Sequence, residues 1–182
     1  MSDGDLEGAA RLAARGDAEA FAVLCHALQD DIWRYCYALA GDRELAFEAA
    51  QETFLRAVTA IRRFRGDAPV RMWLLVLARR SVADLRRRDG RQPTPVRAPV
   101  EPVTGDRSGE VEVNLLVGSL EEDRRQAFVL TQMLGLSYEQ AAKVAGCPIG
   151  TIRSRVFRAR CELVCLLSDV ETPQEEDRHG PP

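Results

Sequence analysis

Residues 137–160 have the sequence SYEQAAKVAGCPIGTIRSRVFRAR, which contains two helix starts separated by a turn. Ser137 followed three residues later by Gln140 has the form of a capping box, in which each side chain bonds the backbone N–H of the other residue. The helix that begins at Ser137 is interrupted by the Gly-Cys-Pro segment at 146–148. A second helix is expected from residue 149 or 150. The stretch therefore predicts two helices joined by a tight turn.

The side chains of these two helices have the pattern of a helix-turn-helix. The first helix carries residues small enough for a second helix to pack closely, namely Ala141, Ala142, Val144 and Ala145. On the second helix, Ile152 and Val156 are one turn apart and are expected to face the interior. The opposite face then carries Arg153, Ser154, Phe157 and Arg158. This arrangement is typical of a helix that enters the major groove of DNA, and the alternative is a basic surface helix of an ordinary bundle.

Charge is distributed unevenly along the chain. The net charge is −3, but residues 1–52 carry four arginines against eleven acids, whereas residues 53–91 carry eleven arginines against three acids. A basic block of this density in an otherwise acidic protein predicts contact with phosphate. Together with the helix-turn-helix, it predicts two separate contacts with nucleic acid.

Composition argues against several other classes of protein. No apolar run in the 182 residues approaches the roughly 20 residues that cross a bilayer, so no membrane insertion is expected. The acidic N-terminus lacks the pattern of a signal peptide, which predicts a cytoplasmic protein. Five cysteines without a Cys-x-x-Cys pair, and two histidines far apart, predict no disulfide framework, metal site or cofactor. Cys161 and Cys165 are expected in the core.

Hydrophobic periodicity predicts an all-α fold with two small helical domains joined by a flexible linker. The first domain spans residues 1–91, with helices ending at Gly41, spanning about 43–64, and running from Pro69 to Arg88. Residues 92–111 form the linker, because four of the nine prolines fall at 93, 95, 99 and 102. The second domain spans 112–167, where Ser119 and Glu122 predict another capping box. Residues 168–182 are expected to be a disordered acidic tail.

Both predicted domains resemble one protein family. Residues 51–57 (QETFLRA), 64–66 (FRG), 73–74 (WL) and 78–79 (AR) resemble conserved region 2 of sigma-70-family transcription initiation factors. Residues 134–138 (LGLSY) and 146–155 (GCPIGTIRSR) resemble region 4 of the same family. With only these two regions and a linker, the chain resembles the extracytoplasmic-function (ECF) group.

The resemblance implies a factor that binds core RNA polymerase and directs it to promoters by recognising −10 and −35 elements and assisting DNA melting. In the family, the segment around residues 51–56 docks on the clamp helices of the large polymerase subunit. It therefore implies polymerase contacts by Gln51, Glu52, Phe54 and Leu55. The alternative that Phe54 and Leu55 are core residues stays open.

The resemblance also implies two sets of promoter contacts. At the −10 element, where a base swung out of the stack must be held, the implied residues are Phe64, Arg65, Asp67, Arg71, Arg79, Arg80, Arg87 and Arg88. Trp73 is expected in the core. At the −35 element, the implied residues are Thr151, Arg153, Ser154, Arg155, Phe157 and Arg158.

Partners and alternatives complete the expectation. The family implies an anti-sigma partner, or an equivalent state in which the two domains pack together and hide both DNA surfaces. No catalytic constellation is found, so neither an enzyme nor a small-molecule substrate is expected. The alternatives are a stand-alone helix-turn-helix regulator that never touches polymerase, a metal-dependent nuclease and a protein-binding helical adaptor.

Overall fold

The computed structural model describes residues 2–90 and 116–170, and every regular element within these ranges is helical. The first unit contains α1 (Asp3–Ala14), α2 (Ala18–Ala40), α3 (Arg43–Ala60), the short 3-10 helix η1 (Ile61–Arg63) and α4 (Val70–Asp89). The second unit contains α6 (Glu122–Phe128), the π-helical turn η2 (Val129–Met133), α7 (Tyr138–Ala145) and α8 (Ile149–Val170). The all-α prediction is confirmed.

Short-range signals place the boundaries of the helices in the first unit. The Asp17 carboxylate accepts the Ala20 N–H at 3.0 Å at the start of α2, and the Asp42 carboxylate accepts the Leu45 N–H at 2.8 Å at the start of α3. Between them Gly41 ends α2 with a φ of 70°, a left-handed conformation that glycine adopts without steric penalty. The predicted end of α2 at Gly41 is confirmed.

The second unit contains the predicted helix-turn-helix. Gln140 N–H donates to Ser137 Oγ at 3.2 Å, and Ser137 N–H donates to Gln140 Oε1 at 2.9 Å, which confirms this capping box. Gly146 ends α7 with a φ of 70°. Ile152 and Val156 of α8 are fully buried, as their spacing predicted.

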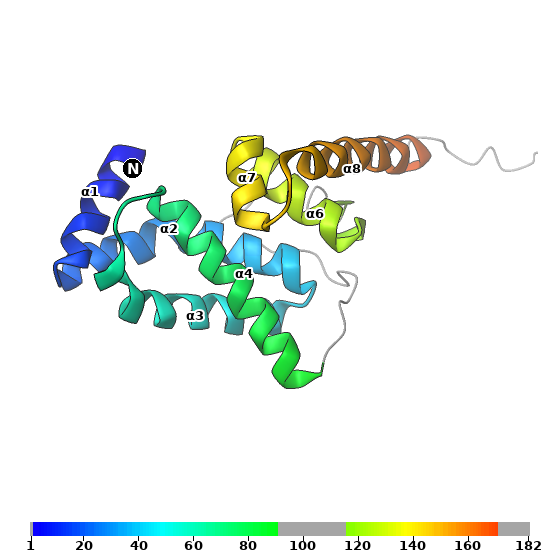
Figure 1. The fold of residues 1–182 in the computed structure, drawn as a ribbon. Coiled ribbons are helices and arrows are strands. Elements are labelled where there is room, and N and C mark those ends of the chain that lie inside the picture. The colour runs from blue at the N-terminus through cyan, green and yellow to red at the C-terminus, as the bar shows by residue number, and fades with distance from the viewer. Residues whose placement is uncertain (1, 91–115, 171–182) are drawn as a thin grey trace, which may run out of the picture.

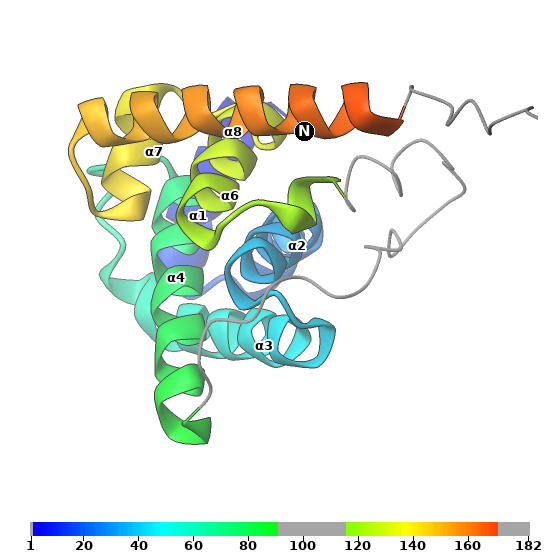
Figure 2. The same ribbon diagram turned by 90° about the vertical axis from the view of Figure 1, so that its right-hand side faces the viewer.

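A continuous apolar core joins the two units. In the first unit it includes Leu24 and Ile32 of α2 and Leu75 of α4, and in the second unit Leu130 and Ile152. Figures 1 and 2 show α6 and α7 lying against α2 and α4, while α8 covers the outer side of the second unit and extends past it. The units are therefore not separate bodies in this structure.

Three boundary predictions differ from the structure. The capping box at Ser119 is wrong, because α6 has Glu121 as its N-cap without a side-chain bond, and the Ser119 hydroxyl donates to the Leu116 carbonyl at 2.7 Å instead. The expected helix over 43–64 ends at Ala60 and tightens into η1. At the far end, α8 continues through Val170, beyond the expected boundary at 167. The predicted linker over 92–111 and the tail after 170 lie outside the described residues.

Candidate functional surfaces

A groove lies between α2 and α3 on the surface of the first unit. It has a volume of about 530 Å³ and is lined by Gln29, Asp30, Trp33, Arg43, Glu44, Phe47, Ala50, Gln51 and Phe54. Phe47 is 58% exposed, which is unusual for a phenylalanine on a packed helix. Three aromatic side chains among polar and charged ones are a composition typical of a surface that binds another protein.

The four residues implied in polymerase binding separate into two groups. Gln51 and Phe54 line the groove, and Phe54 also packs against the core. Leu55 is 65% exposed outside the groove, which argues against the alternative that it is a core residue. Glu52 is partly buried and forms an ion pair with Arg56 at 2.7 Å. Sequence reasoning missed Phe47, although its spacing of four residues from Gln51 and seven from Phe54 is that of one helix face.

The loop between η1 and α4 carries the first group of residues implied in −10 recognition. Arg65 and Asp67 are exposed on it. Phe64 is partly buried, with its ring centroid 5.5 Å from that of Trp73 and the two rings tilted by 56°. Trp73 also packs against the core, so its expected core position is confirmed in part. The pair links the start of the loop to the first turn of α4.

The arginines of α4 have different surroundings. Arg71 pairs with Asp31 of α2 at 2.7 Å, and Arg87 pairs with Asp84. Asp84 also accepts from Arg56 at 2.6 Å, and these hydrogen bonds, that of Arg56 first, lower the pKa of its carboxyl. Arg80 and Arg88 are exposed. Part of the basic charge of this helix is therefore neutralised within the protein.

The recognition helix α8 presents its predicted face to solvent. Arg153, Ser154, Phe157 and Arg158 are all exposed, with Phe157 at 68%. Thr151 is partly buried in the first turn of the helix. Arg155 differs from the others, because it pairs with Asp123 of α6 and lies 3.7 Å from the Cys147 sulfur. Its guanidinium therefore links α8 to α6 within the second unit.

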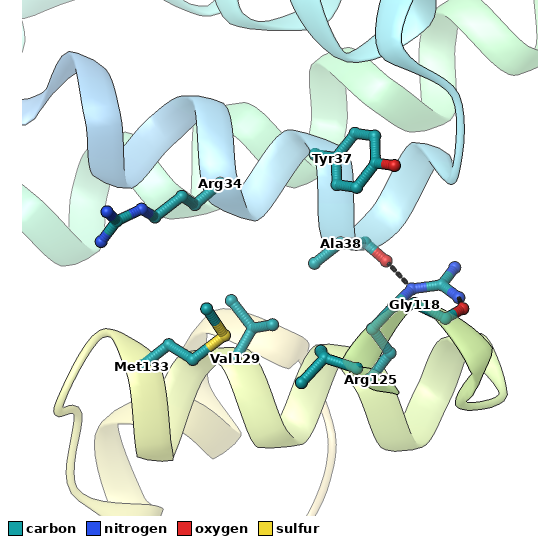
Figure 3. A pocket seen from close by; sticks show the side chains of 8 residues that line it. Arg34, Tyr37, Ala38, Gly118, Arg125, Val129 and Met133 are labelled. Carbon is teal, nitrogen blue, oxygen red and sulfur yellow. Dashed lines mark hydrogen bonds between the residues drawn. The ribbon is translucent and has the colours of Figure 1, made fainter. Parts of the chain in front are cut away.

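A buried arginine connects the two units. Arg125 of α6 is 2% exposed and donates to the Ala38 carbonyl of α2 at 2.6 Å, and also to the carbonyls of Gly118 and Leu120. Figure 3 shows its guanidinium between α2 and the segment before α6, at the edge of a cleft of about 20 Å³. Burial lowers the pKa of Arg125. Its positive charge lies at the C-terminal end of α2, where the helix dipole is negative.

Two further contacts cross the same interface. Arg86 of α4 donates to the Leu39 carbonyl at 2.5 Å and to Glu122 of α6 at 2.8 Å. The Gln126 side-chain amide donates to the Tyr35 hydroxyl at 2.9 Å, and burial raises the pKa of Tyr35. Sequence reasoning missed Arg125, Gln126 and Tyr35, since nothing in their local pattern marks them as partners.

The second unit covers part of the α4 surface. A Cβ added to Gly146, in the turn of the helix-turn-helix, would lie 3.2 Å from an Arg79 guanidinium nitrogen. Arg79 Nε is buried without a hydrogen-bond partner. Of the two expected alternatives, an anti-sigma partner or packing that hides both surfaces, the packing seen here leaves the face of α8 exposed and partly buries Arg79.

Other predicted features can be compared with the described residues. Cys161 and Cys165 are exposed, so their expected core position is wrong, because they lie on the outer side of α8. Cys36 is fully buried, and burial raises the pKa of its thiol to about 12. In the described ranges no cluster of three or more histidine, cysteine or acidic side chains could hold a metal ion. None of the helices described in residues 2–90 and 116–170 could span a membrane.

The two helical units match two family models. The model for sigma-70 region 2 matches residues 24–92, and the model for sigma-70 region 4 matches residues 110–163. The first match covers the groove, the exposed loop and α4, and the second covers the helix-turn-helix.

Relatives and solved structures agree with this class. The chain is 45% identical over 166 residues to the ECF RNA polymerase sigma factor SigC of Mycobacterium tuberculosis, covering 87% of this chain and 88% of the relative. It is 34% identical over 164 residues to the RNA polymerase sigma-H factor of Pseudomonas aeruginosa, covering 80% and 85%. The sigma factor RpoE of Bartonella quintana, solved with the anti-sigma factor NepR, matches with a TM-score of 0.69 at 25% identity, over 85% of this chain and all of that one. CnrH, solved with the cytosolic domain of CnrY, matches at 0.67 and 26%, covering 90% and 97%.

The class that the fold and these surfaces define is a two-unit helical transcription factor with a DNA-recognition helix. The chain belongs to the sigma-70 family of RNA polymerase sigma factors, and its relatives are of the ECF group. Its function is to direct RNA polymerase to promoters. The family is not known as a class of enzymes, and the alternative of a stand-alone regulator is not favoured.

Proposed function

We propose that the chain holds core RNA polymerase through the groove between α2 and α3, with Gln51, Glu52, Phe54 and Leu55 at or beside the contact and Phe47 added to them. The observation that carries this proposal is the exposed aromatic surface of the groove. Other apolar side chains of the first unit, among them Leu12, Val23 and Val58, are exposed outside the groove, but only the groove combines an exposed phenylalanine with further aromatic side chains in one hollow, as is typical of a protein-binding site. Glu52 can bind the polymerase only after its ion pair with Arg56 breaks.

The −10 element is assigned to the exposed loop and α4. Arg65 and Asp67 are exposed and follow Phe64 in the sequence, so this loop offers polar groups and aromatic rings that could hold an unpaired base. The arginines Arg71, Arg79, Arg80, Arg87 and Arg88 would contact phosphates or bases along the helix. Arg71 and Arg87 must first exchange their carboxylate partners for DNA. Their contacts with phosphate should weaken as the salt concentration rises, because binding releases cations from the DNA.

The −35 element is assigned to the exposed face of α8. Arg153 and Arg158 can form bidentate contacts with guanine, and Ser154 and Phe157 can contact neighbouring base edges. Thr151, at the N-terminal end of α8, is placed to bind a phosphate with help from the helix dipole. Arg155 can join them once it leaves Asp123.

The packed arrangement is proposed as a resting state of the free protein. In it the turn of the helix-turn-helix lies against Arg79, which is partly buried, so this arginine is fully available to the −10 element only after the two units separate. Polymerase, which must hold both surfaces at the spacing of the two promoter elements, would stabilise the separated state. The two solved structures are both complexes with a second protein, RpoE with the anti-sigma factor NepR and CnrH with the cytosolic domain of CnrY. An anti-sigma partner for this chain is therefore part of the proposal.

No catalytic step is assigned to the chain itself. The factor contributes binding energy to promoter melting, and the polymerase performs RNA synthesis. Because polymerase and promoter DNA are in the cytoplasm of a bacterial cell, we assign the protein to that compartment.

Run-off transcription with core polymerase on a pool of genomic fragments tests the proposal. Wild-type protein is expected to produce discrete transcripts whose promoters share two elements. The variant Phe47→Ser is expected to produce no such transcripts and not to co-purify with core polymerase. The control is Leu12→Ser, which removes an apolar side chain of similar exposure, 48%, from α1 outside the groove. Equal polymerase binding by both variants would assign the groove another role.

A further inference from the structure

The first turn of α4 lacks a cap from its own sequence. An α-helix leaves its first N–H groups without partners, and a side chain at the N-cap normally accepts from one of them. Here the N-cap is Pro69, which forms no side-chain cap, and the first turn carries no acidic residue. Val70 is 0% exposed, so water cannot reach its N–H.

Glu7 of α1 supplies the missing acceptor. Its Oε1 accepts the Val70 N–H at 2.7 Å, across 63 residues of sequence. A carboxylate at this position also interacts favourably with the positive end of the α4 dipole. The bond therefore fixes where α4 begins and the direction in which the preceding loop enters it.

The same N-terminal helix also contacts the other end of the loop. α1 packs on η1, the element that precedes the loop, and Gly16 just after α1 lies beside Arg62 of η1, whose guanidinium would be 3.8 Å from an added Cβ. The loop of residues 64–69 is thus held at both ends by α1. It carries Phe64, Arg65 and Asp67, the residues assigned to the unpaired −10 base.

We propose that α1 is a positioning element for the −10 recognition loop and that Glu7 is its main positioning residue. This role rests on the proposed function of the loop. The family model for region 2 begins at residue 24, after the end of α1 at Ala14, so the match to the family does not include this element. Leu6, Ala10 and Ala13 anchor α1 in the core, which leaves Glu7 rigidly directed at α4.

The test uses full-length protein reconstituted with core polymerase. The template is the genomic fragment that gives the strongest wild-type run-off transcript, prepared as a duplex and as a fork with the −10 segment unpaired. Glu7→Ala removes the acceptor, whereas Glu7→Gln keeps an oxygen that can accept from Val70. Asp3→Ala removes one negative charge from the same helix and is the matched control.

Glu7→Ala is expected to lower binding to the fork template about tenfold, the usual effect of losing a cap or a buried hydrogen bond. Glu7→Gln and Asp3→Ala are expected to stay within about twofold of wild type, because both retain the acceptor. Hydrogen exchange in peptides covering residues 64–73 is expected to rise in Glu7→Ala alone, while peptides from α3 stay unchanged.

Three results would overturn the inference: wild-type binding by Glu7→Ala, equal losses in the alanine and glutamine variants, or an equal loss in Asp3→Ala. Failure of the proposed function is distinguishable from all three, because wild-type protein would then yield no run-off transcript. A general loss of folding would raise exchange in α3 as well, and that outcome also counts against a local positioning role.

Discussion

The two surfaces assigned to DNA differ in how far the protein's own contacts occupy them. On α8, Arg153 and Arg158 are exposed, and the neighbouring Phe157 is exposed as well. On α4, Arg79 lies under the turn at Gly146, while Arg71 and Arg87 pair with carboxylates. The difference indicates that the packed state restricts −10 recognition and leaves the −35 surface open. Regulation by packing would then act on promoter melting more than on the first encounter with duplex DNA.

The physical basis of the packed state is an interface with a polar centre. Arg125 provides hydrogen bonds for carbonyls of two units, and one of them belongs to the last turn of α2. Breaking that contact leaves buried polar groups without partners unless the units separate and water enters. Unlike a purely apolar contact, such an interface therefore favours either the closed arrangement or full separation.

The largest effect is expected on the open surface. The double variant Arg153→Ala/Arg158→Ala should lose about 2–6 kcal/mol of −35 duplex binding, since each good bidentate base contact contributes about 1–3 kcal/mol. Fluorescence anisotropy with a labelled −35 duplex measures this loss. The control is Arg160→Ala, whose guanidinium already binds Gln132 at 2.6 Å. An equal loss in the control would mean that Arg153 and Arg158 only attract DNA phosphates and do not recognise bases.

The next effect concerns the interface. Arg125→Met should lower the free energy of unfolding by about 1–3 kcal/mol, because the carbonyls it serves lose their donor. It should also increase the radius of gyration measured by small-angle X-ray scattering as the units separate. Binding of the −35 duplex should stay at the wild-type value. The neighbouring variant Arg124→Gln is the control, since an ion pair as exposed as that of Arg124 with Glu162 contributes little to stability. A compact Arg125→Met protein would contradict the role given to this arginine.

A smaller effect is expected at Arg79, where DNA binding should change more than stability. Replacing it with Met removes a buried Nε that has no partner, so the unfolding free energy should change by less than about 1 kcal/mol. Binding of holoenzyme to a fork template with an unpaired −10 segment should nevertheless fall about tenfold, as for the loss of one charged contact. Urea titration and fork binding measure the two quantities. If both fell together, Arg79 would be a structural residue only.

The smallest effect is a difference in thiol reactivity. At pH 8, iodoacetamide should modify Cys161 and Cys165 within minutes and leave Cys36 unmodified, because burial blocks access and a pKa of about 12 keeps its thiol protonated. Only as the pH approaches 12 would its thiolate become abundant. Cys147, partly buried near Arg155, should react faster in Arg125→Met than in wild type. Peptide mass spectrometry measures each site, and labelling in denaturant gives the full-reaction control.

The sequence by itself determined the helical class, the helix-turn-helix and the exposed face of its second helix. Ser137 and Gln140, the left-handed glycines Gly41 and Gly146, and the burial of Ile152 all depend on residues within one or two turns. The resemblance in the motifs at 51–57 and 146–155 supplied the family. These features could be predicted because helix starts, stops and faces are set by local spacing.

Only the tertiary structure decided which surfaces are open. Glu7 accepts a hydrogen bond from the first residue of α4, 63 residues away in the sequence, and Arg125 donates one to Ala38, 87 residues away. No rule of residue spacing applies at such separations. The partly buried Arg79 and the exposed Arg153 both belong to helices that are rich in arginine. They differ because one helix packs against the turn at Gly146 and the other faces solvent. That difference arises from how the helices pack, and packing depends on many distant side chains at once.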